Sequence, residues 1–324
     1  MEKAAVLGCG SWGTALSVLL ARNGVGVTLW GRRREDTKAV QALRENRRYL
    51  PGVRLPDEVD ATSSRPETAD FWVVAVPSDA LREVCGLIPD GSVTVVVASK
   101  GLEPATAKLM SEVVREERPE AHVCALSGPN LAVEIAKGIP TATVVAARDL
   151  DVAEWVRARF MCRTFRVYTS EDVVGVELGG ALKNVLAIGA GMSDGLGFGD
   201  NTKGALLARG LREIAALGEE LGAERATFMG ISGVGDLFAT AASRLSRNYR
   251  VGRLLAEGMR LDRALDEIGQ VAEGVPTSEA AVELARRSNL DIPLMEAIHR
   301  VVQGRLAPLD AVGELMERTP RVEI

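Results

Sequence analysis

The feature that most constrains this chain is a glycine pattern close to its beginning. A short apolar run, residues 4–7, leads into Gly8-x-Gly10-x-x-Gly13, and apolar residues at helical spacing follow. In a strand–turn–helix unit the first glycine permits the turn, the second lets a pyrophosphate approach the backbone, and the third lets the helix pack closely on the strand. The helix N-terminus also offers free N–H groups to phosphates. The pattern predicts a dinucleotide site; the alternative is a glycine-rich turn without a ligand.

The residues after the second expected strand bear on the type of dinucleotide. That strand, residues 25–30, is followed by Arg32, Arg33 and Arg34, and the first carboxylate is Glu35. An acidic residue near this strand end usually binds the ribose hydroxyls of NAD, whereas arginine accommodates a 2′-phosphate. The guanidinium forks of Arg32 and Arg33 suit a phosphate. We therefore expect NADP(H) to be preferred over NAD(H), which remains an alternative. In the competing interpretation the arginines cap the next helix and face water, as we expect for Arg34.

The size and composition of the chain indicate two domains. Its 324 residues exceed the range in which a single core usually keeps growing. The hydrophobic fraction of 47% and the charged fraction of 26% are typical of a soluble globular protein. A net charge of -5 and an aromatic content of 4% argue against a nucleic-acid partner, which needs a basic surface and stacking platforms.

Targeting and redox features favour a cytoplasmic protein. The first expected strand begins so early that we expect no signal peptide, and no uninterrupted apolar run suggests an integral membrane segment. The cysteines are scattered without a C-x-x-C pair, so we expect buried thiols and no metal site. These cysteines are Cys9, Cys85, Cys124 and Cys162.

Residues 1–169 are predicted to form an α/β, Rossmann-like dinucleotide-binding domain. Apolar runs typical of buried parallel strands alternate with helical segments, which predicts a mostly parallel, doubly wound sheet whose last strands we leave unordered. After the second strand, strands are expected at 70–77, 92–99, 121–126, 141–147 and 165–168. Helices are expected at 35–48, 80–87, 105–117, 131–137 and 152–160.

Residues 170–324 are predicted to form an all-α substrate-binding and catalytic domain, because the strand pattern disappears. The glycine-rich stretch 189–199 has no preceding strand, so we interpret it as a flexible connection between helices rather than a phosphate loop. Helices are expected at 173–189, 203–221, 223–229, 247–257, 261–268, 277–288, 293–303 and 308–317.

Lys183 is the candidate general acid/base. It interrupts an apolar helix rich in small residues, 174–185, where an ammonium group is costly unless it is paired or functional. Desolvation would lower its pKa and make it a usable proton donor and acceptor. Hydride transfer to a carbonyl needs such a proton, and His122 and His299 lie in a strand run and on a charged helix, where they are better explained as structural or exposed. The alternative is a lysine that extends to water.

Two strand ends carry candidate substrate-binding residues at the edge where ligands usually bind. Lys100 follows an apolar strand and could bind a substrate phosphate or carbonyl oxygen, or the nicotinamide end; the alternative is a solvated loop lysine. Ser127-Gly128-Pro129 follows the next strand and could present its backbone to a ligand, although it could equally be an ordinary turn.

The helical half contains two further polar clusters. Asp236 lies among small residues near an expected helix start, where it could cap the helix, pair with Lys183 or bind a substrate hydroxyl. Ser246-Arg247-Asn248 combines a hydroxyl, a guanidinium and an amide, which at a helix N-terminus suits a phosphate. The alternative for this cluster is a simple serine N-cap.

Taken together, these motifs resemble those of the bacterial NAD(P)-dependent sn-glycerol-3-phosphate dehydrogenases over essentially the whole chain. Several motifs in the same order are far more specific than any one of them. The matching segments are Gly8–Ala15, Ser99–Leu102, Ser127–Pro129, Glu177–Val185, Ile188–Gly195, Gly235–Leu237, Ser246–Asn248 and Val271–Gly274.

The resemblance implies reversible, NAD(P)H-dependent reduction of dihydroxyacetone phosphate to sn-glycerol 3-phosphate, which supplies phospholipid synthesis, and a homodimer. Lys183 would accept the proton during alcohol oxidation. The substrate would contact Lys100, Gly128, Asp236, Ser246, Arg247 and Asn248. The cofactor would contact Ser11, Trp12, Arg32, Lys100, Ala132, Arg247, Val271 and Glu273.

One departure from the family pattern concerns the substrate site. After Ser-Gly-Pro the family usually has Ser or Thr and then Phe, whereas this chain has Asn130 and Leu131. The amide of Asn130 would have to replace a hydroxyl contact.

Two other functions compete with this interpretation. One is a different two-domain reductase, such as a ketopantoate or 3-hydroxyacid enzyme, against which the cluster Ser246-Arg247-Asn248 favours a phosphorylated substrate. The other is a nicotinamide-binding sensor without turnover, which would have no reason to place Lys183 in an apolar helix.

Overall fold

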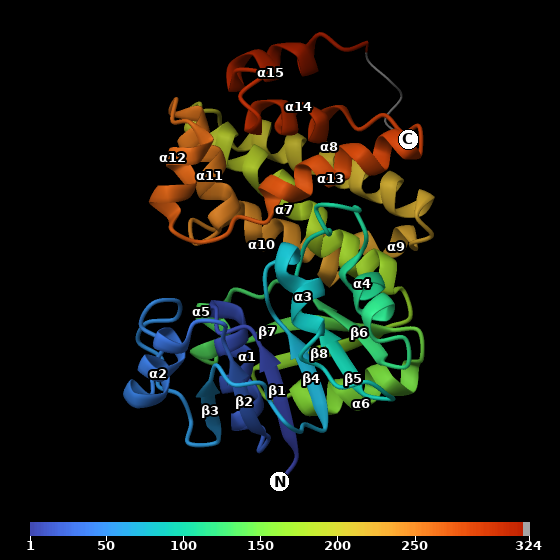
Figure 1. Cartoon of the computed structure of the whole chain (residues 1–324). Helices are drawn as coiled ribbons and strands as arrows, with labels where there is room; N and C mark the ends of the chain where they lie inside the picture. Colours follow the sequence, from blue (N-terminus) through green and yellow to red (C-terminus); the bar gives the residue numbers. More distant parts are fainter. Residues whose placement is uncertain (320–324) are drawn as a thin grey trace.

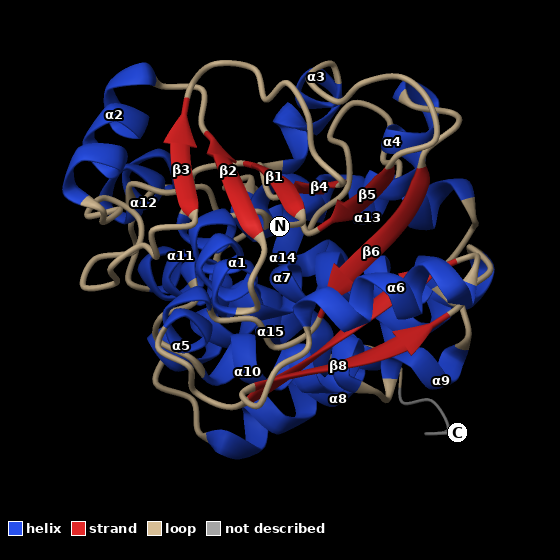
Figure 2. Cartoon of the chain, turned by 90° about the horizontal axis from the view of Figure 1, so that it is seen from below, coloured by secondary structure: helices blue, strands red, loops and turns tan. Residues whose placement is uncertain are grey.

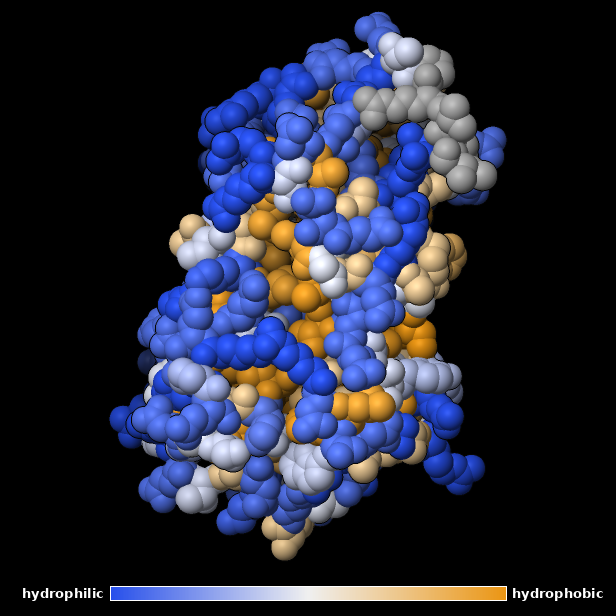
Figure 3. Space-filling view, turned by 90° about the vertical axis from the view of Figure 1, so that its right-hand side faces the viewer, coloured by the Kyte–Doolittle hydropathy of each residue, from blue (hydrophilic) through white to orange (hydrophobic). Residues whose placement is uncertain are grey.

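The protein consists of a sheet domain and a helical domain stacked on one another, as the computed structural model of residues 1–319 shows (Figure 1). The last strand ends at Ser170, and the first long helix of the helical domain begins at Val173. On the side seen in Figure 3, hydrophobic residues gather at the waist between the two domains, whereas hydrophilic residues cover much of the outer surface.

The sheet domain contains eight strands in the order β3-β2-β1-β4-β5-β6-β7-β8. All neighbouring pairs are parallel except β6 and β7, so the prediction of a mostly parallel sheet is confirmed. The strands are β1 (Lys3–Leu7), β2 (Gly26–Trp30), β3 (Val59–Thr62), β4 (Phe71–Val74), β5 (Thr94–Val97), β6 (His122–Ser127), β7 (Thr141–Ala147) and β8 (Phe165–Ser170). The edge strand β3 was not expected from the sequence, because Val-Asp-Ala-Thr is not a continuous apolar run like those of the equally short strands β4 and β5.

Helices cover both faces of this sheet, which makes it doubly wound (Figure 2). The side chain of Val6 in β1 joins the apolar cluster under α1 and α6, whereas its neighbours Ala5 and Leu7 join the cluster under α3 and α4. Successive side chains of a strand point to opposite faces, so both sets are buried. The helical segments are α1 (Ser11–Arg22), α2 (Arg34–Leu43), the short turn η1 (Ser78–Ala80), α3 (Leu81–Cys85), α4 (Met110–Glu117), α5 (Ala132–Ala136) and α6 (Leu150–Phe160).

Two of the expected helices of this domain lack five of the predicted residues at one end. The helix expected at 35–48 ends at Leu43, because Arg44 adopts a left-handed conformation with φ 50°. The helix expected at 105–117 begins only at Met110, because Leu102 and Leu109 pair in an antiparallel bridge that closes the preceding loop.

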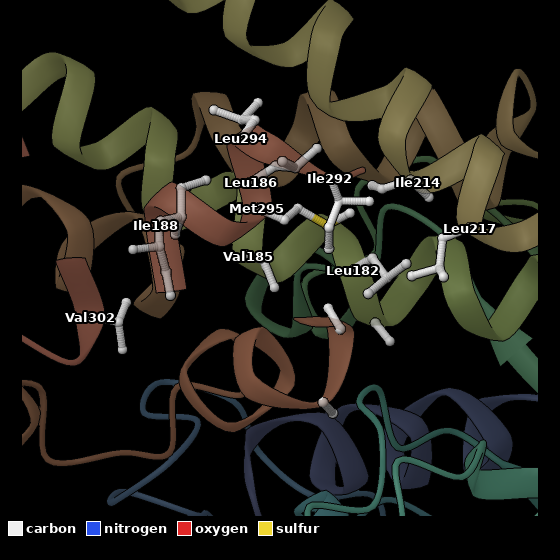
Figure 4. Close-up of a cluster of buried hydrophobic side chains, with 14 of the residues drawn as sticks. Leu182, Val185, Leu186, Ile188, Ile214, Leu217, Ile292, Leu294, Met295 and Val302 are labelled. Atoms are coloured by element: carbon white, nitrogen blue, oxygen red, sulfur yellow. The ribbon is translucent and has the colours of Figure 1, made fainter. Parts of the chain in front are cut away.

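The helical domain is built around α7 (Val173–Gly195), which is surrounded by other helices (Figure 1, Figure 4). By length and composition α7 could cross a membrane, but 94% of its most hydrophobic window is buried inside the protein, as expected for a core helix. Around it lie α8 (Asp200–Glu220), α9 (Arg225–Phe228), the π-helical turn η2 (Ile231–Gly235), α10 (Asp236–Ala242), α11 (Arg247–Ala256), α12 (Leu261–Ile268), α13 (Gly274–Arg287), α14 (Pro293–Val302) and α15 (Pro308–Met316).

The prediction of a flexible connection over residues 189–199 is wrong for its first part, because α7 continues to Gly195. Glycine is needed there for close packing between helices rather than for flexibility. A Cβ atom on Gly191 would lie 1.9 Å from the carbonyl oxygen of Tyr249 in α11, and one on Gly252 would lie 1.8 Å from that of Ile188. Only residues 196–199 connect α7 with α8.

We predict that Gly191→Ala destabilises the protein, because its methyl group would overlap backbone atoms of α11. Overpacking of this kind costs about 1–3 kcal/mol or more of the free energy of unfolding. The matched control is Gly204→Ala in α8, where a Cβ atom meets nothing within 4 Å and should add about 0.5–1 kcal/mol through helix propensity. Urea unfolding of the variants measures both effects, and equal stability would contradict the packing argument.

Candidate active site

Two lysines from different domains converge on one buried carboxylate. Lys183 of α7 donates through Nζ to Oδ1 of Asp236 and, at 2.6 Å, to Oγ1 of Thr240. Lys100, which follows β5, donates through Nζ to Oδ2 of Asp236 at 2.8 Å and to the carbonyl oxygen of Gly128 at 2.7 Å. Asp236 is only 1% exposed, so both ion pairs are shielded from water.

Each ammonium group keeps one hydrogen for a ligand. A lysine ammonium carries three N–H donors, and two of them are used in each case. Within residues 1–319, the third hydrogen of Lys183 and that of Lys100 have no hydrogen-bond acceptor. Because one carboxylate balances two ammonium groups, the cluster retains a positive charge and attracts an oxygen that gains negative charge.

The environment of Lys183 brings the pKa of its amino group into the neutral range. Burial disfavours the charged form and lowers the pKa of Lys183 to about 7; the charge of Asp236 opposes this shift, and the charge of Lys100 adds to it. A group that is half protonated near neutral pH both donates and accepts a proton readily.

Sharp turns at the strand ends place these groups. Gly128 has φ 156°, and a Cβ atom there would lie 2.9 Å from the Cα atom of Thr143. Gly180 of α7 packs so closely on the end of β6 that a Cβ atom would lie 2.2 Å from Oγ of Ser127. The π-helical turn η2 leads directly into Asp236, whose side chain does not cap α10. Of the three roles considered for Asp236, the geometry realises the pairing with Lys183.

The cluster Ser246-Arg247-Asn248 lies at the start of α11. Ser246 is the N-cap, and its Oγ accepts from the backbone N–H of Tyr249 at 3.3 Å. Arg247 is partly buried, which lowers its guanidinium pKa, while the charge of nearby Glu273 opposes the shift. Arg247 therefore supplies the charge and the fork geometry that suit a phosphate in this cluster.

Asn248 bonds mainly to the protein. Its Nδ2 donates to Oδ1 of Asn184 at 2.8 Å, and its Oδ1 accepts from the backbone N–H of Gly274 at 2.9 Å. These two bonds tie α7, α11 and the start of α13 together. The second Nδ2 hydrogen is left for a ligand.

The glycine turn after β1 has the geometry that a dinucleotide needs. Gly8 has φ 128°, and a Cβ atom there would lie 2.4 Å from the carbonyl oxygen of Ala75. A Cβ atom on Gly13 would lie 1.9 Å from the carbonyl oxygen of Gly8. At Gly10, by contrast, a Cβ atom meets nothing within 4 Å, so the backbone is open to a pyrophosphate there. The residues thus fit a dinucleotide.

Neighbouring side chains hold this turn in place. Ser11 is the first residue of α1, and the indole N–H of Trp12 donates to the carbonyl oxygen of Ala98 at 3.0 Å. The buried amide of Asn46 donates from Nδ2 to the carbonyl oxygen of Cys9 at 3.1 Å and to Oγ1 of Thr14 at 2.8 Å. Sequence reasoning missed Asn46, because no motif separates it from the surrounding helix and turn.

The other predicted cofactor residues surround the same edge of the sheet. Arg32 and Arg33 follow β2 and are exposed. Ala132 begins α5, and Val271 is 47% exposed in the loop before α13. Arg32 and Arg33 therefore have room to meet a phosphate.

Glu273 bonds across the domain boundary. Its carboxylate accepts from the backbone N–H of Ser78 at 3.0 Å and from Oγ of Ser78 at 2.7 Å, and burial raises its pKa. No local pattern indicated this contact, because the two residues are far apart in the chain.

Asn130 contributes a buried amide near Gly128. Its Nδ2 donates to Oγ1 of Thr143 at 3.1 Å, and Oγ1 of Thr143 donates to the carbonyl oxygen of Ser127 at 3.0 Å. The Oδ1 atom of Asn130 is buried and has no hydrogen-bond partner among the described residues. The amide could therefore offer an acceptor where the family pattern has a hydroxyl.

The two histidines bond to serines outside this cluster. The ring of His122 lies 2.9 Å from Oγ of Ser92 at the exposed start of β6, and Nδ1 of the buried His299 lies 3.0 Å from Oγ of Ser278. Within the part of the chain that the structure describes, no group of three or more His, Cys, Asp or Glu side chains is placed to hold a metal ion.

Comparison with known proteins assigns the whole arrangement to one family. The family models described as the N-terminus and the C-terminus of NAD-dependent glycerol-3-phosphate dehydrogenase match residues 3–153 and 172–313. The chain belongs to this family. The enzyme named glycerol-3-phosphate dehydrogenase [NAD(P)+] from Moorella thermoacetica is 48% identical over 330 residues, which cover 100% of this chain and 98% of that protein. The enzyme of the same name from Oceanobacillus iheyensis is 45% identical over 332 residues, covering 100% and 96%.

Solved structures agree with this assignment. The crystal structure of glycerol-3-phosphate dehydrogenase from Coxiella burnetii superimposes with a TM-score of 0.94 at 37% identity, covering 98% of this chain and 99% of that one. A ketopantoate reductase from Ralstonia eutropha has a TM-score of 0.61 at 17% identity, covering 96% and 100%, and shares the fold alone. The family therefore favours a phosphorylated substrate over the competing ketoacid.

We predict that Gly10→Ala weakens dinucleotide binding, whereas Gly13→Ala lowers stability. The methyl group at position 10 enters open space, so this variant should keep its unfolding temperature. It should bind dinucleotide at least about tenfold more weakly, since the pyrophosphate must approach the backbone at this position. The methyl group at position 13 would overlap the carbonyl oxygen of Gly8 and should lower the unfolding temperature by several degrees, about 2–4 °C per kcal/mol. Thermal unfolding and fluorescence titration with NADPH measure both. A Gly10→Ala variant with unchanged affinity would contradict a pyrophosphate at this turn.

Proposed function

We propose that this protein catalyses the reversible, NAD(P)H-dependent reduction of dihydroxyacetone phosphate to sn-glycerol 3-phosphate. The observation that carries the proposal is the pair Lys183 and Lys100 on the shared carboxylate of Asp236, each with one N–H to spare. This is the chemistry that carbonyl reduction requires, because negative charge develops on the carbonyl oxygen and must be stabilised and protonated. The names of the relatives support the substrate.

Lys183 is the proposed proton donor in reduction and acceptor in oxidation. When bound, the reduced nicotinamide supplies the hydride for the carbonyl carbon. As the carbon–oxygen π electrons move to oxygen, the ammonium of Lys183 transfers a proton to that oxygen, and Lys100 stabilises the charge by a hydrogen bond. Asp236 and Thr240 hold the Nζ atom of Lys183 in place through both states.

Arg247 is the proposed anchor for the substrate phosphate. Its partly buried guanidinium at the start of α11 combines with the N-terminal N–H groups of that helix, and both favour an anion. Ser246 and the free Nδ2 hydrogen of Asn248 complete this contact, while the backbone of Gly128 and the amide of Asn130 border the substrate on the side of the sheet. Binding of the phosphate orients the reacting carbon.

The dinucleotide is proposed to lie along the turn of Gly8, Gly10 and Gly13, with Ser11, Trp12, Ala132, Val271 and Glu273 around it. The exposed Arg32 and Arg33 support a preference for NADP(H), because no carboxylate precedes Glu35 at the end of β2 to bind the ribose hydroxyls of NAD.

Further proposals concern the cellular role and assembly. We infer that the product supplies phospholipid synthesis and that the enzyme works in the cytoplasm. A homodimer is supported by exposed apolar side chains that are close in the chain, within residues 229–245, since contiguous exposed apolar surface usually marks a contact surface. They are Met229, Val234, Phe238 and Leu245, with exposed fractions of 55%, 42%, 68% and 62%.

The direct test is the loss of reduced-nicotinamide absorbance on addition of dihydroxyacetone phosphate, with NADPH and NADH in parallel. We expect turnover with the phosphate ester, much slower turnover with dihydroxyacetone, and a higher specificity constant with NADPH. An unmodified protein that is folded and binds NADPH but does not turn over the ester would overturn the substrate assignment.

Lys183→Ala should lower kcat by roughly 10²–10⁴-fold with cofactor binding retained.

The pKa of Lys183 predicts opposite pH dependences for the two directions. Reduction needs the protonated amine, so its kcat/KM should fall about tenfold per pH unit as pH rises above about 7. Oxidation of glycerol 3-phosphate needs the neutral amine, so its kcat/KM should fall as pH drops below about 7. Initial rates between pH 6 and 9 in both directions check this sign, and profiles that move together would exclude Lys183 as the titrating group.

A further inference from the structure

The segment that carries Lys100 belongs to the sheet domain but is embedded in the core of the helical domain. Leu102, Ala107 and Leu109 are buried in the apolar cluster built around α7. The backbone carbonyl of Thr106 also accepts from Nη1 of Arg287 at 3.2 Å. Residues 100–111 therefore form the seam between the two domains.

A buried carboxylate fastens the far end of this seam to α7. Glu177 accepts from the backbone N–H of Ser111 at 2.9 Å and from its hydroxyl group. The hydroxyl oxygen of Ser111 in turn accepts from Nη1 of Arg115 at 3.2 Å. Ser111 lies in the first turn of α4, where N–H groups lack partners within the helix and favour a carboxylate.

Glu177 and Lys183 lie on the same helix, and Ser111 and Lys100 lie on the same seam. Along α7 the two residues are separated by about 9 Å, a little under two turns. Between them, Gly180 packs against Ser127 with no room for a Cβ atom. A shift of α7 against α4 would therefore move Lys183 relative to Lys100.

We propose that Glu177 is a positioning residue, which holds the seam 100–111 on α7 so that Lys100 and Lys183 meet on Asp236. The inference rests on the proposed function, since it assumes that the two lysines act on one substrate. Glu177 touches neither lysine by a hydrogen bond, and it acts through Ser111 and the rigid helices between them.

The strength of this contact follows from its burial. Glu177 is 8% exposed, and burial raises its pKa to about 7, while the bonds from Ser111 oppose the shift. A buried N–H left without its acceptor is costly, so α4 and α7 remain together as long as the carboxyl group is present.

The helical domain offers a matched control for the loss of such a carboxyl group. Glu213 of α8 accepts from the backbone N–H groups of Leu294 and Met295 at 2.8 and 3.0 Å, at the start of α14. Burial raises its pKa to about 7 as well. Glu213 thus makes the same kind of contact, but within one domain and away from the seam.

The test compares Glu177→Ala, Glu177→Gln and Glu213→Ala in the full-length protein. Both alanine variants should lose stability to a similar extent in urea unfolding. Only Glu177→Ala should lose kcat, by about 100-fold for a displacement near 1 Å, with the affinity for NADPH unchanged because the glycine turn is not affected. Glu177→Gln keeps an acceptor for the backbone N–H of Ser111 and should recover most of kcat.

Two further measurements keep the outcome decisive. If Glu177→Ala does not fold, Ser111→Ala removes one of the two bonds and should show a smaller loss of kcat with NADPH affinity retained. Hydrogen exchange should increase at residues 100–111 in the Glu177 variant and not in the Glu213 variant, whether or not dihydroxyacetone phosphate is the substrate.

Equal kcat in the two alanine variants, or unchanged exchange in the seam, would overturn the positioning role. Absence of turnover in the unmodified protein would instead overturn the proposed function, and the exchange measurement would still decide the role of Glu177.

Discussion

The site depends on one carboxylate that is shared by two ammonium groups. Asp236 is buried and pairs with both Lys100 and Lys183, so one carboxylate compensates the charge of two ammonium groups. The arrangement leaves one positive charge in excess and one N–H on each lysine, and it sets the pKa of Lys183 near neutrality through burial opposed by the charge of Asp236. Loss of Asp236 would therefore do more than remove a contact, because the two neighbouring ammonium groups would then lack the carboxylate that compensates their mutual repulsion. Thr240 supports the same Nζ atom, although no sequence motif drew attention to it.

The candidate site is built from residues of both domains. The sheet domain provides the dinucleotide turn and the strand ends that carry Lys100 and Gly128, while the helical domain provides Lys183, Asp236 and the start of α11. Polar contacts between domains occur on both sides of this junction: Glu273 bonds to Ser78, and Glu177 bonds to Ser111. In each contact one carboxyl group takes two bonds from a single serine, so directional hydrogen bonds as well as apolar packing define how the two domains are placed.

Local chemistry could be predicted from the sequence far better than contacts between distant segments. The glycine turn, the parallel sheet and a lysine in an apolar helix each carry a signal within a few residues. Strand β3 carries no continuous apolar run, and the glycines of 189–195 look like a loop until the neighbouring helices are known, because their role lies in close contacts with α11 and α14. The bonds of Asn248 to Asn184 and Gly274 have no local signature either. The prediction for residues 189–195 failed because glycine serves both flexibility and close packing.

The apolar character of α7 has a consequence for synthesis on the ribosome. The sheet domain precedes it in the chain, whereas the helices that cover it, from α8 onward, are translated afterwards. Until they emerge, a segment hydrophobic enough to enter a bilayer is exposed to water and to the machinery that recognises nascent membrane helices. Lys183 and Asn184 lie near its centre, where a bilayer penalises a charge and an amide most. The residues that serve the folded site therefore also mark this helix as a core element while the chain is incomplete.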